Sequence, residues 1–373
     1  MEEPRGADST GSGQPNHFNS TNNSYCTDLS TEDIYGLKVT YYCVSSTAAV
    51  ACILAIILIL VSKRHKKFVY RLTLYLMVAT LLVEVVNILG VAPVYHNGTT
   101  VVVREGFEGL CIAAGFLYQV AFWMELLVIF WIVLYLLMIL VFRCNVTGTK
   151  QEACGLTVVL ILPFLFNWIP FVKDMYGLSG PHCWIKQSMN SNCEYDNVGI
   201  ALMFSLLNGP EFFTISVVLV SLVAIAIVMC RKVMKQQPRV GQPSIHQQGL
   251  KEVLPLLLYL IIHFVLWAAG VVLRICDAIL SAQDKTPPHS VLLVLHHMVI
   301  NARLLLIPLI CLLHLSMSFC RRKQNKQHAL NTTTCYIVPN EFTDQEDDPL
   351  IIKGSSEAIS SKEYKSIFEG TEQ

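Results

Sequence analysis

Three ionisable side chains, Glu84, Glu125 and Arg303, lie in the middle of long apolar stretches of the sequence. Charged groups in apolar surroundings are costly, and they usually pair with one another or serve a function. Asn87 and Asn301 add hydrogen-bonding groups to the same stretches, and we group all five residues as a buried polar core. Two interpretations stay open. The charges form a pair whose rearrangement accompanies a change of state, or they only neutralise one another.

The stretches that carry these residues are long enough to cross a lipid bilayer. A helix needs about 20 apolar residues to span the hydrocarbon core. Seven runs meet this requirement, at approximately 37–61, 70–94, 110–142, 154–172, 208–230, 253–280 and 291–317. The predicted fold class is therefore an all-α membrane protein, a seven-transmembrane helix bundle. The start of the fifth run is the least defined, because Asn-Gly-Pro-Glu at 208–211 interrupts its apolar pattern.

The composition agrees with a membrane protein. Of the 373 residues, 53% are hydrophobic and 14% are charged, whereas soluble domains carry about 25% charged residues. The formal net charge is zero, so no nucleic-acid partner is expected.

At a rise of about 1.5 Å per residue, the expected helices place Glu84, Glu125 and Arg303 close to the bilayer centre.

The distribution of lysine and arginine predicts the orientation. The connections after the first, third and fifth runs are basic, as is the segment after the seventh, whereas the opposite connections carry few basic residues. Basic loops face the cytoplasm, which puts the N-terminus outside and the C-terminus in the cytoplasm. We therefore expect a disordered extracellular tail at 1–34, the bundle at 35–320 and a disordered cytoplasmic tail at 321–373.

Potential glycosylation sites agree with this orientation. Asn19, Asn22 and Asn97 each begin an Asn-x-Ser/Thr sequence on the predicted outer side, where the acceptor enzyme works.

Two cysteines and two short motifs resemble a known superfamily. Cys111 lies at the outer end of the third run, and Cys183 lies in the long loop after the fourth. This placement is similar to that in G-protein-coupled receptors. The Cys183-Trp184-Ile185 sequence and Arg71-Leu-Thr-Leu-Tyr-Leu in the second run resemble the secretin/adhesion and cyclic-AMP-receptor-like branch. The resemblance implies a Cys111–Cys183 disulfide, which the oxidising exterior permits.

Two missing motifs and a short outer tail distinguish the chain from other branches of this superfamily. The third run ends without the Asp-Arg-Tyr of rhodopsin-like receptors, and the seventh lacks their Asn-Pro-x-x-Tyr. The outer tail of about 35 residues is too short for a secretin or adhesion ectodomain, so the cyclic-AMP-receptor-like group is the nearest. The resemblance implies a multi-pass receptor of the plasma membrane that binds an extracellular ligand and activates a heterotrimeric G protein.

Polar residues near the outer and inner ends of the runs are candidates for contacts with partners. Those expected at the ligand-facing rim are Glu211, Arg274, Asp277, His296 and His297. Those expected to face the G protein are Arg143, Arg231, Lys232 and Lys235. The alternatives are snorkelling side chains and solvated loop ends at the rim, and anionic lipid headgroups at the inner surface.

Neither a metal nor an organic cofactor is expected. The histidines within the runs, His263, His296, His297 and His314, are dispersed in depth, which argues against a zinc hydrolase. A retinal Schiff base needs a lysine in the seventh run, and there is none between Lys285 and Lys323. We therefore expect no enzyme.

Two short motifs in the C-terminal segment resemble sorting signals. One is an acidic dileucine type that ends at Leu350 and Ile351, and the other is a tyrosine type from Tyr364 to Ile367. They suggest arrestin or clathrin adaptors as partners. The alternative function for the whole chain is a transporter or channel whose path uses Glu84, Glu125 and Arg303, although the sequence contains no repeated halves.

Overall fold

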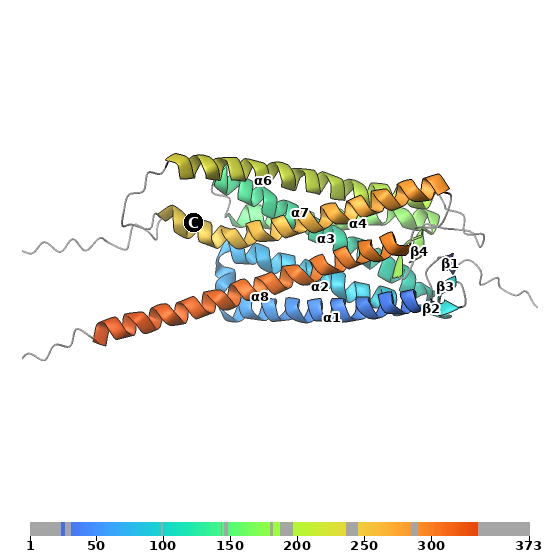
Figure 1. Ribbon diagram of the computed structural model, residues 1–373, viewed down its shortest axis with the longest axis horizontal. Coiled ribbons are helices and arrows are strands. Elements are labelled where there is room, and N and C mark those ends of the chain that lie inside the picture. The colour runs from blue at the N-terminus through green and yellow to red at the C-terminus, as the bar shows by residue number, and fades with distance from the viewer. Residues whose placement is uncertain are drawn as a thin grey trace, which may run out of the picture. The chain divides into compact units, whose positions relative to one another are not determined.

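The computed structural model describes residues 24–26, 31–97, 100–142, 144, 148–179, 182–186, 197–235, 245–284 and 290–334. Seven helices within these ranges are long and apolar enough to cross a membrane. They run side by side along a common axis, whereas the short strands gather at one end (Figure 1). The predicted all-α, seven-helix bundle is confirmed.

Four helices supply the first four spans, three consecutive helical segments supply the fifth, and two long helices supply the last two. The first four are α1 (Thr31–Val61), α2 (Phe68–Val91), α3 (Glu108–Leu140) and α4 (Thr149–Asn167), with short helices η2 (Arg64–Lys66) after α1 and η3 (Ile169–Lys173) after α4. The fifth span comprises α5 (Asn197–Met203), the π-helical turn η4 (Phe204–Asn208) and α6 (Gly209–Lys235). The sixth and seventh are α7 (Ile245–Asp284) and α8 (Ser290–Thr334).

The described chain falls into two compact units, Met1–Arg321 and Arg322–Gln373. The first contains the spans, the buried charge pair and the disulfide discussed below. In the second, helix α8 continues to Thr334. The sequence instead predicted a disordered tail from residue 321, and the remainder of that tail lies outside the described residues. Basic and polar residues without apolar periodicity gave no signal that the helix would continue.

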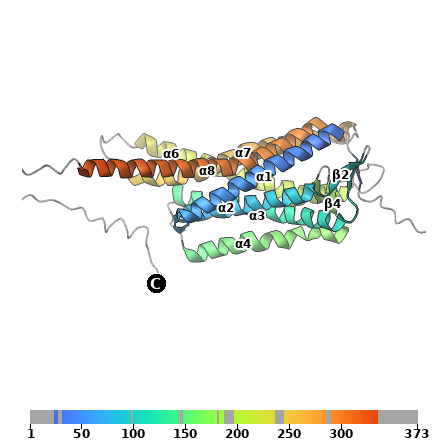
Figure 2. The ribbon, with the colours of Figure 1, turned by 90° about the horizontal axis from the view of Figure 1, so that it is seen from below.

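Helices α2 and α3 form the centre of the bundle. Helix α2 packs against α1 and α3, while α3 also packs against α4, α6 and α7; α4 lies along α3 at the edge of the bundle (Figure 2). The principal apolar cluster includes Leu76 from α2, Ile132 from α3 and Ile307 from α8, each at most 1% exposed. The buried faces of helices far apart in sequence therefore share one core.

Large apolar side chains cover the outside of the bundle as well. Ile53, Leu160, Val220 and Leu313 are all at least 45% exposed. Exposure of so many large apolar side chains is unfavourable in water. It matches a lipid environment, in which helices satisfy their backbone hydrogen bonds internally.

Two small sheets lie at one end of the bundle. Strand β3 (Thr100–Val103) is central in an antiparallel sheet between β1 (Ser24–Cys26) and β2 (Val94–Asn97). Strands β4 (Tyr176–Ser179) and β5 (His182–Ile185) form a separate hairpin, with Leu178 opposite Cys183. Strand β1 and the first turn of α1, which begins at Thr31, fall within the segment for which the sequence predicted only disorder.

The fifth span begins earlier than the sequence predicted. The expected start was residue 208, but α5 begins at Asn197. The π-helical turn η4 accommodates the interrupting segment, and Gly209 N–H donates to the Phe204 carbonyl. A wider turn lets Pro210, which has no N–H, stay within a continuous span.

Candidate functional site

A buried ion pair joins α3 to α8 in the middle of the bundle. Arg303 Nη2 donates to Glu125 Oε2 at 2.9 Å, and the two side chains are 2% and 1% exposed. Thr80 of α2 donates its hydroxyl to the other carboxylate oxygen, Oε1, at 3.1 Å. Both oxygens of Glu125 are therefore engaged, which is what a buried carboxylate requires.

Helix α7 adds an aromatic wall beside Arg303. The guanidinium carbon lies 4.7 Å from the Trp267 ring centroid, within cation–π distance. The His263 ring lies 5.6 Å from that of Trp267 and is buried. Among the described residues, Arg303 Nε and Nη1 have no hydrogen-bond partner. The arginine thus has donors to spare beyond its bond to Glu125.

Glu84 of α2 is a second buried carboxylate near the same pair. It is fully buried, and neither of its oxygens forms a hydrogen bond with the described residues. Ser45 and Asn87 are its polar neighbours, and the charges of Glu125 and Arg303 act on it. Of the two partners that the sequence allowed for Arg303, the structure pairs it with Glu125 and leaves Glu84 nearby.

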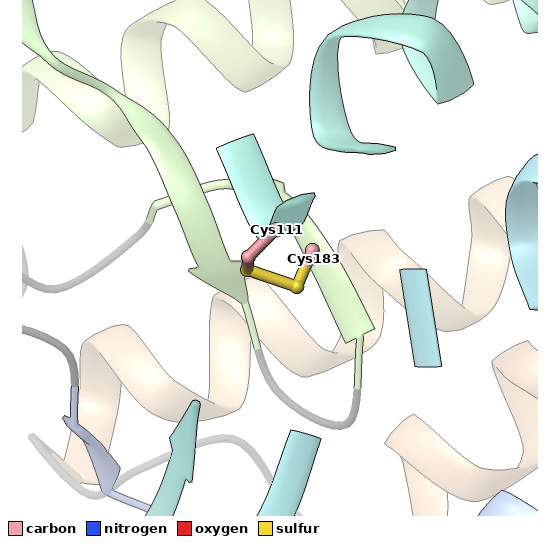
Figure 3. The surroundings of a disulfide bond; sticks show 2 residues. All are labelled: Cys111 and Cys183. Atoms are coloured by element: carbon pink, nitrogen blue, oxygen red, sulfur yellow. A yellow bond between two sulfur atoms is a disulfide. The ribbon is translucent and has the colours of Figure 1, made fainter. Parts of the chain in front are cut away.

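The β4–β5 hairpin is anchored to α3 by the disulfide that the resemblance implied. Cys111 in the first turn of α3 bonds to Cys183 of β5, with a Cα–Cα distance of 5.1 Å (Figure 3). All eight residues of β4 and β5 are buried. The hairpin is therefore packed into the end of the bundle and is not a loose loop above it.

Close backbone approach fixes the hairpin against α3. A Cβ added at Gly115 would lie 3.1 Å from both the Cα and the carbonyl oxygen of Trp184. This distance is shorter than ordinary van der Waals contact, so the strand can approach α3 this closely only because residue 115 has no side chain. One turn of α3 separates this contact from the disulfide at Cys111.

His182 of the hairpin is surrounded by aromatic rings from three helices. Its ring centroid lies 6.0 Å from that of Tyr41 in α1, 5.9 Å from Tyr118 in α3 and 5.6 Å from His297 in α8. The Tyr41 hydroxyl and His297 Nδ1 are hydrogen-bonded to each other. Trp184, two residues further along β5, stacks 6.0 Å from His182. The hairpin thus bridges three helices in one aromatic cluster.

A chain of hydrogen bonds runs from the hairpin through α3 to the fifth span. Trp184 Nε1 donates to Gln119 Oε1 at 2.7 Å, and Gln119 Nε2 donates to the Leu206 carbonyl at 3.0 Å. Trp123 Nε1 donates to the same carbonyl at 2.7 Å. In a regular helix this carbonyl would accept from residue 210, but Pro210 has no N–H. Two side chains of α3 replace the missing donor.

Helices α2 and α4 are joined by a polar contact that involves the Arg71-Leu-Thr-Leu-Tyr-Leu motif. Arg71 Nε lies 2.7 Å from Glu152 Oε1 of α4, and the Tyr75 hydroxyl donates to the same oxygen at 2.6 Å. The Tyr75 ring stacks 5.9 Å from that of Trp131 in α3. Arg71 and Tyr75 of the motif therefore hold three helices together.

Two ionisable groups, one at the start of the hairpin and one just after it, show the effect of burial. Burial raises the pKa of the Tyr176 phenol, which donates to the Asn167 carbonyl at 2.6 Å. Burial also lowers the pKa of the Lys186 amine, although Asp174 and Glu108 partly offset this effect. Water is thus partly excluded from the edges of the hairpin.

The candidate rim residues that the structure describes are buried. Glu211, His296 and His297 are each at most 7% exposed, and His296 Nδ1 lies 3.1 Å from the Gly270 carbonyl oxygen. The side chains of Arg274 and Asp277 lie outside the described residues. The prediction that these residues face a ligand stays a prediction; the His297 ring lies 5.6 Å from that of His182 in the hairpin.

Other predicted sites are only partly described. Arg231 is exposed near the end of α6, and the side chains of Lys232 and Lys235 are not described. The backbone of Asn97 lies at the end of β2. The remaining predicted residues lie outside the described residues: Asn19, Asn22, Arg143, Leu350, Ile351, Tyr364 and Ile367.

Sequence reasoning missed several residues that the structure brings to the site. They are Tyr41, Thr80, Gln119, Trp123, His182 and Trp267. A proline within a helix frees the carbonyl four residues before it, so Pro210 pointed to Leu206 as an acceptor. Nothing in the sequence identified Gln119 and Trp123 as its donors.

Comparison with known proteins bears on the fold. No protein-family model matches the sequence, and a search of curated proteins found no significant match. Among solved structures, the crystal structure of squid rhodopsin matches with a TM-score of 0.54 at 13% identity, over 79% of this chain and 87% of that one. The chain has the rhodopsin fold.

The site described above lies within this seven-helix fold. The Arg303–Glu125 pair joins the third and seventh spans of this chain, and the Cys111–Cys183 disulfide anchors the hairpin to the third span. Within the described part of the chain, no group of three His, Cys, Asp or Glu side chains is arranged to hold a metal ion. The chemistry that the described site offers is charge pairing and hydrogen bonding within a membrane-length bundle.

Proposed function

We propose that this chain is a G-protein-coupled receptor of the plasma membrane. In this proposal the N-terminus and the β4–β5 hairpin face the exterior, and the C-terminus lies in the cytoplasm. The observation that carries it is the rhodopsin fold together with a hairpin tied by a disulfide to the third helix. The basic inner connections and the outer glycosylation sequences support the orientation.

The charge cluster supplies the two-state element that a receptor needs. Arg303 is bonded to Glu125 and has unpartnered donors, while Glu84 is a nearby carboxylate with Ser45 and Asn87 as polar neighbours. A shift of α8 that brought Arg303 to Glu84 would exchange one carboxylate for the other. Such an exchange keeps the arginine paired, and a proton taken up by the carboxyl that is left behind avoids the large cost of a lone buried charge.

Ligand and G protein act on opposite ends of the bundle in this proposal. An extracellular ligand would act near Glu211, His296 and His297, the last of which lies beside His182 of the hairpin. The G protein would contact the basic inner ends that include Arg143, Arg231, Lys232 and Lys235. Arrestin or clathrin adaptors would bind the sorting motifs of the C-terminal tail.

The test is nucleotide exchange by purified G proteins. The full chain is reconstituted into lipid nanodiscs, and GTPγS binding is measured on a panel covering the main Gα classes. Faster exchange on at least one Gα than with empty nanodiscs is the expected result. A variant with Arg303→Met and Glu125→Gln, which removes the pair, serves as the matched control and should change the rate. No acceleration on any member, with or without candidate ligands, would contradict the proposal.

A further inference from the structure

The hairpin and the fifth span are joined by a hydrogen-bond relay that the receptor proposal does not require. The relay comprises the Trp184 indole, the Gln119 amide and the Leu206 carbonyl, at 2.7 Å and 3.0 Å. All three residues are buried. The Gln119 amide accepts from Trp184 through Oε1 and donates to Leu206 through Nε2. If Trp184 is displaced, the Gln119 side chain must follow it, and the bond to Leu206 then moves or breaks.

The position of Leu206 makes the relay sensitive. Its carbonyl belongs to the π-helical turn Phe204–Asn208, and Pro210 deprives it of the usual helical donor. The π-helical turns are rare and often mark functional positions. The local shape of the fifth span therefore depends on hydrogen bonds from side chains of α3, whereas a regular helix satisfies its carbonyls with its own backbone.

The hairpin end of the relay is held rigidly. Trp184 follows Cys183, which is bonded to Cys111, and its backbone rests on Gly115 of α3. Gln119 lies one turn beyond Gly115 on the same helix. Movement of the hairpin would thus reach Gln119 directly through the Trp184 indole.

We propose that Gln119 is a positioning residue that couples the outer hairpin to the π-helical turn of the fifth span. It acts through Trp184 on one side and Leu206 on the other. Trp123, which also donates to Leu206, steadies the turn without contacting the hairpin through this chain. The coupling itself does not depend on the proposed receptor function. Only its consequence rests on that function, namely that a ligand displacing the hairpin would reshape the fifth span.

The test uses hydrogen–deuterium exchange of the purified full chain, without G protein. The reporter is the Gly209 amide, which donates to the Phe204 carbonyl across the turn. Exchange is measured with the Cys111–Cys183 disulfide intact and after its reduction. In the wild type, reduction should release the hairpin and raise exchange roughly tenfold, which corresponds to about 1.4 kcal/mol and is within the range for one buried hydrogen bond.

Two variants separate coupling from simple loosening. Gln119→Leu keeps the side-chain volume but removes both bonds, so exchange should already be raised and reduction should add nothing. Trp123→Phe removes the other donor to Leu206, so exchange should be raised and reduction should still add its effect. If Gln119→Leu does not fold, Trp184→Phe removes the coupling at its outer end. This variant keeps the bond from Gln119 to Leu206, so exchange should start near the wild-type value, and reduction should again add nothing.

Two results would overturn the proposal. One is that reduction leaves exchange at Gly209 unchanged in the wild type. The other is that reduction raises exchange in Gln119→Leu as much as in the wild type. Because no G protein takes part, these outcomes are distinct from a failure to accelerate nucleotide exchange, which would overturn only the receptor proposal.

Discussion

Removal of one partner from the Arg303–Glu125 pair is expected to be far more harmful than removal of both. The bond is 2.9 Å long, and both side chains are almost inaccessible. Loss of one partner leaves an uncompensated charge in an apolar bundle, which typically costs about 3–5 kcal/mol. Arg303→Met and Glu125→Gln should each lower stability by this amount. The double variant should recover most of the loss, because no buried charge is left alone at this pair.

The assay is the apparent unfolding free energy of the purified chain, measured for both single variants and the double variant. The coupling energy from this cycle should exceed about 2 kcal/mol. The Arg71–Glu152 pair serves as a control. It has the same chemistry as the buried pair, but its side chains are more exposed, at 27% and 12%. Its cycle should give at most about 1 kcal/mol. Simple additivity for Arg303 and Glu125 would refute the reasoning, because residues that share a site do not behave independently.

Three further predictions concern orientation, the disulfide and the hairpin contact. A tag at the N-terminus should be labelled on intact cells and a C-terminal tag only after permeabilisation; labelling of the C-terminal tag on intact cells would reverse the topology. Non-reducing peptide mapping should recover Cys111 joined to Cys183, and loss of this 72-residue closure should cost roughly 4 kcal/mol in thermal or chemical unfolding. Gly115→Ala should destabilise the chain by about 1–3 kcal/mol, because its Cβ meets the Trp184 backbone. Gly109→Ala in the same helix, where a Cβ meets nothing within 4 Å, should be neutral or slightly stabilising; equal effects in unfolding measurements would contradict the close packing.

The candidate site divides into residues that sequence could find and residues that it could not. Glu84, Glu125 and Arg303 stood out because charges are rare in apolar runs, and all three are buried in the structure. His182 and Trp184 lie in a loop where no periodicity predicts contacts. Their packing against Tyr41, Tyr118 and Gln119 joins residues up to 141 positions apart, so local sequence carries no record of it.

The sequence by itself determined the number of spans, because about 20 consecutive apolar residues have few stable alternatives to a membrane-length helix. The choice of Glu125 over Glu84 as the partner of Arg303 depended on the tertiary structure, since depth along a helix does not fix which neighbour a side chain reaches. Tertiary structure also decided that Asn-Gly-Pro would lie within a continuous span. Two donors from α3 satisfy the carbonyl that Pro210 frees, and such compensation exists only when a second helix is in place.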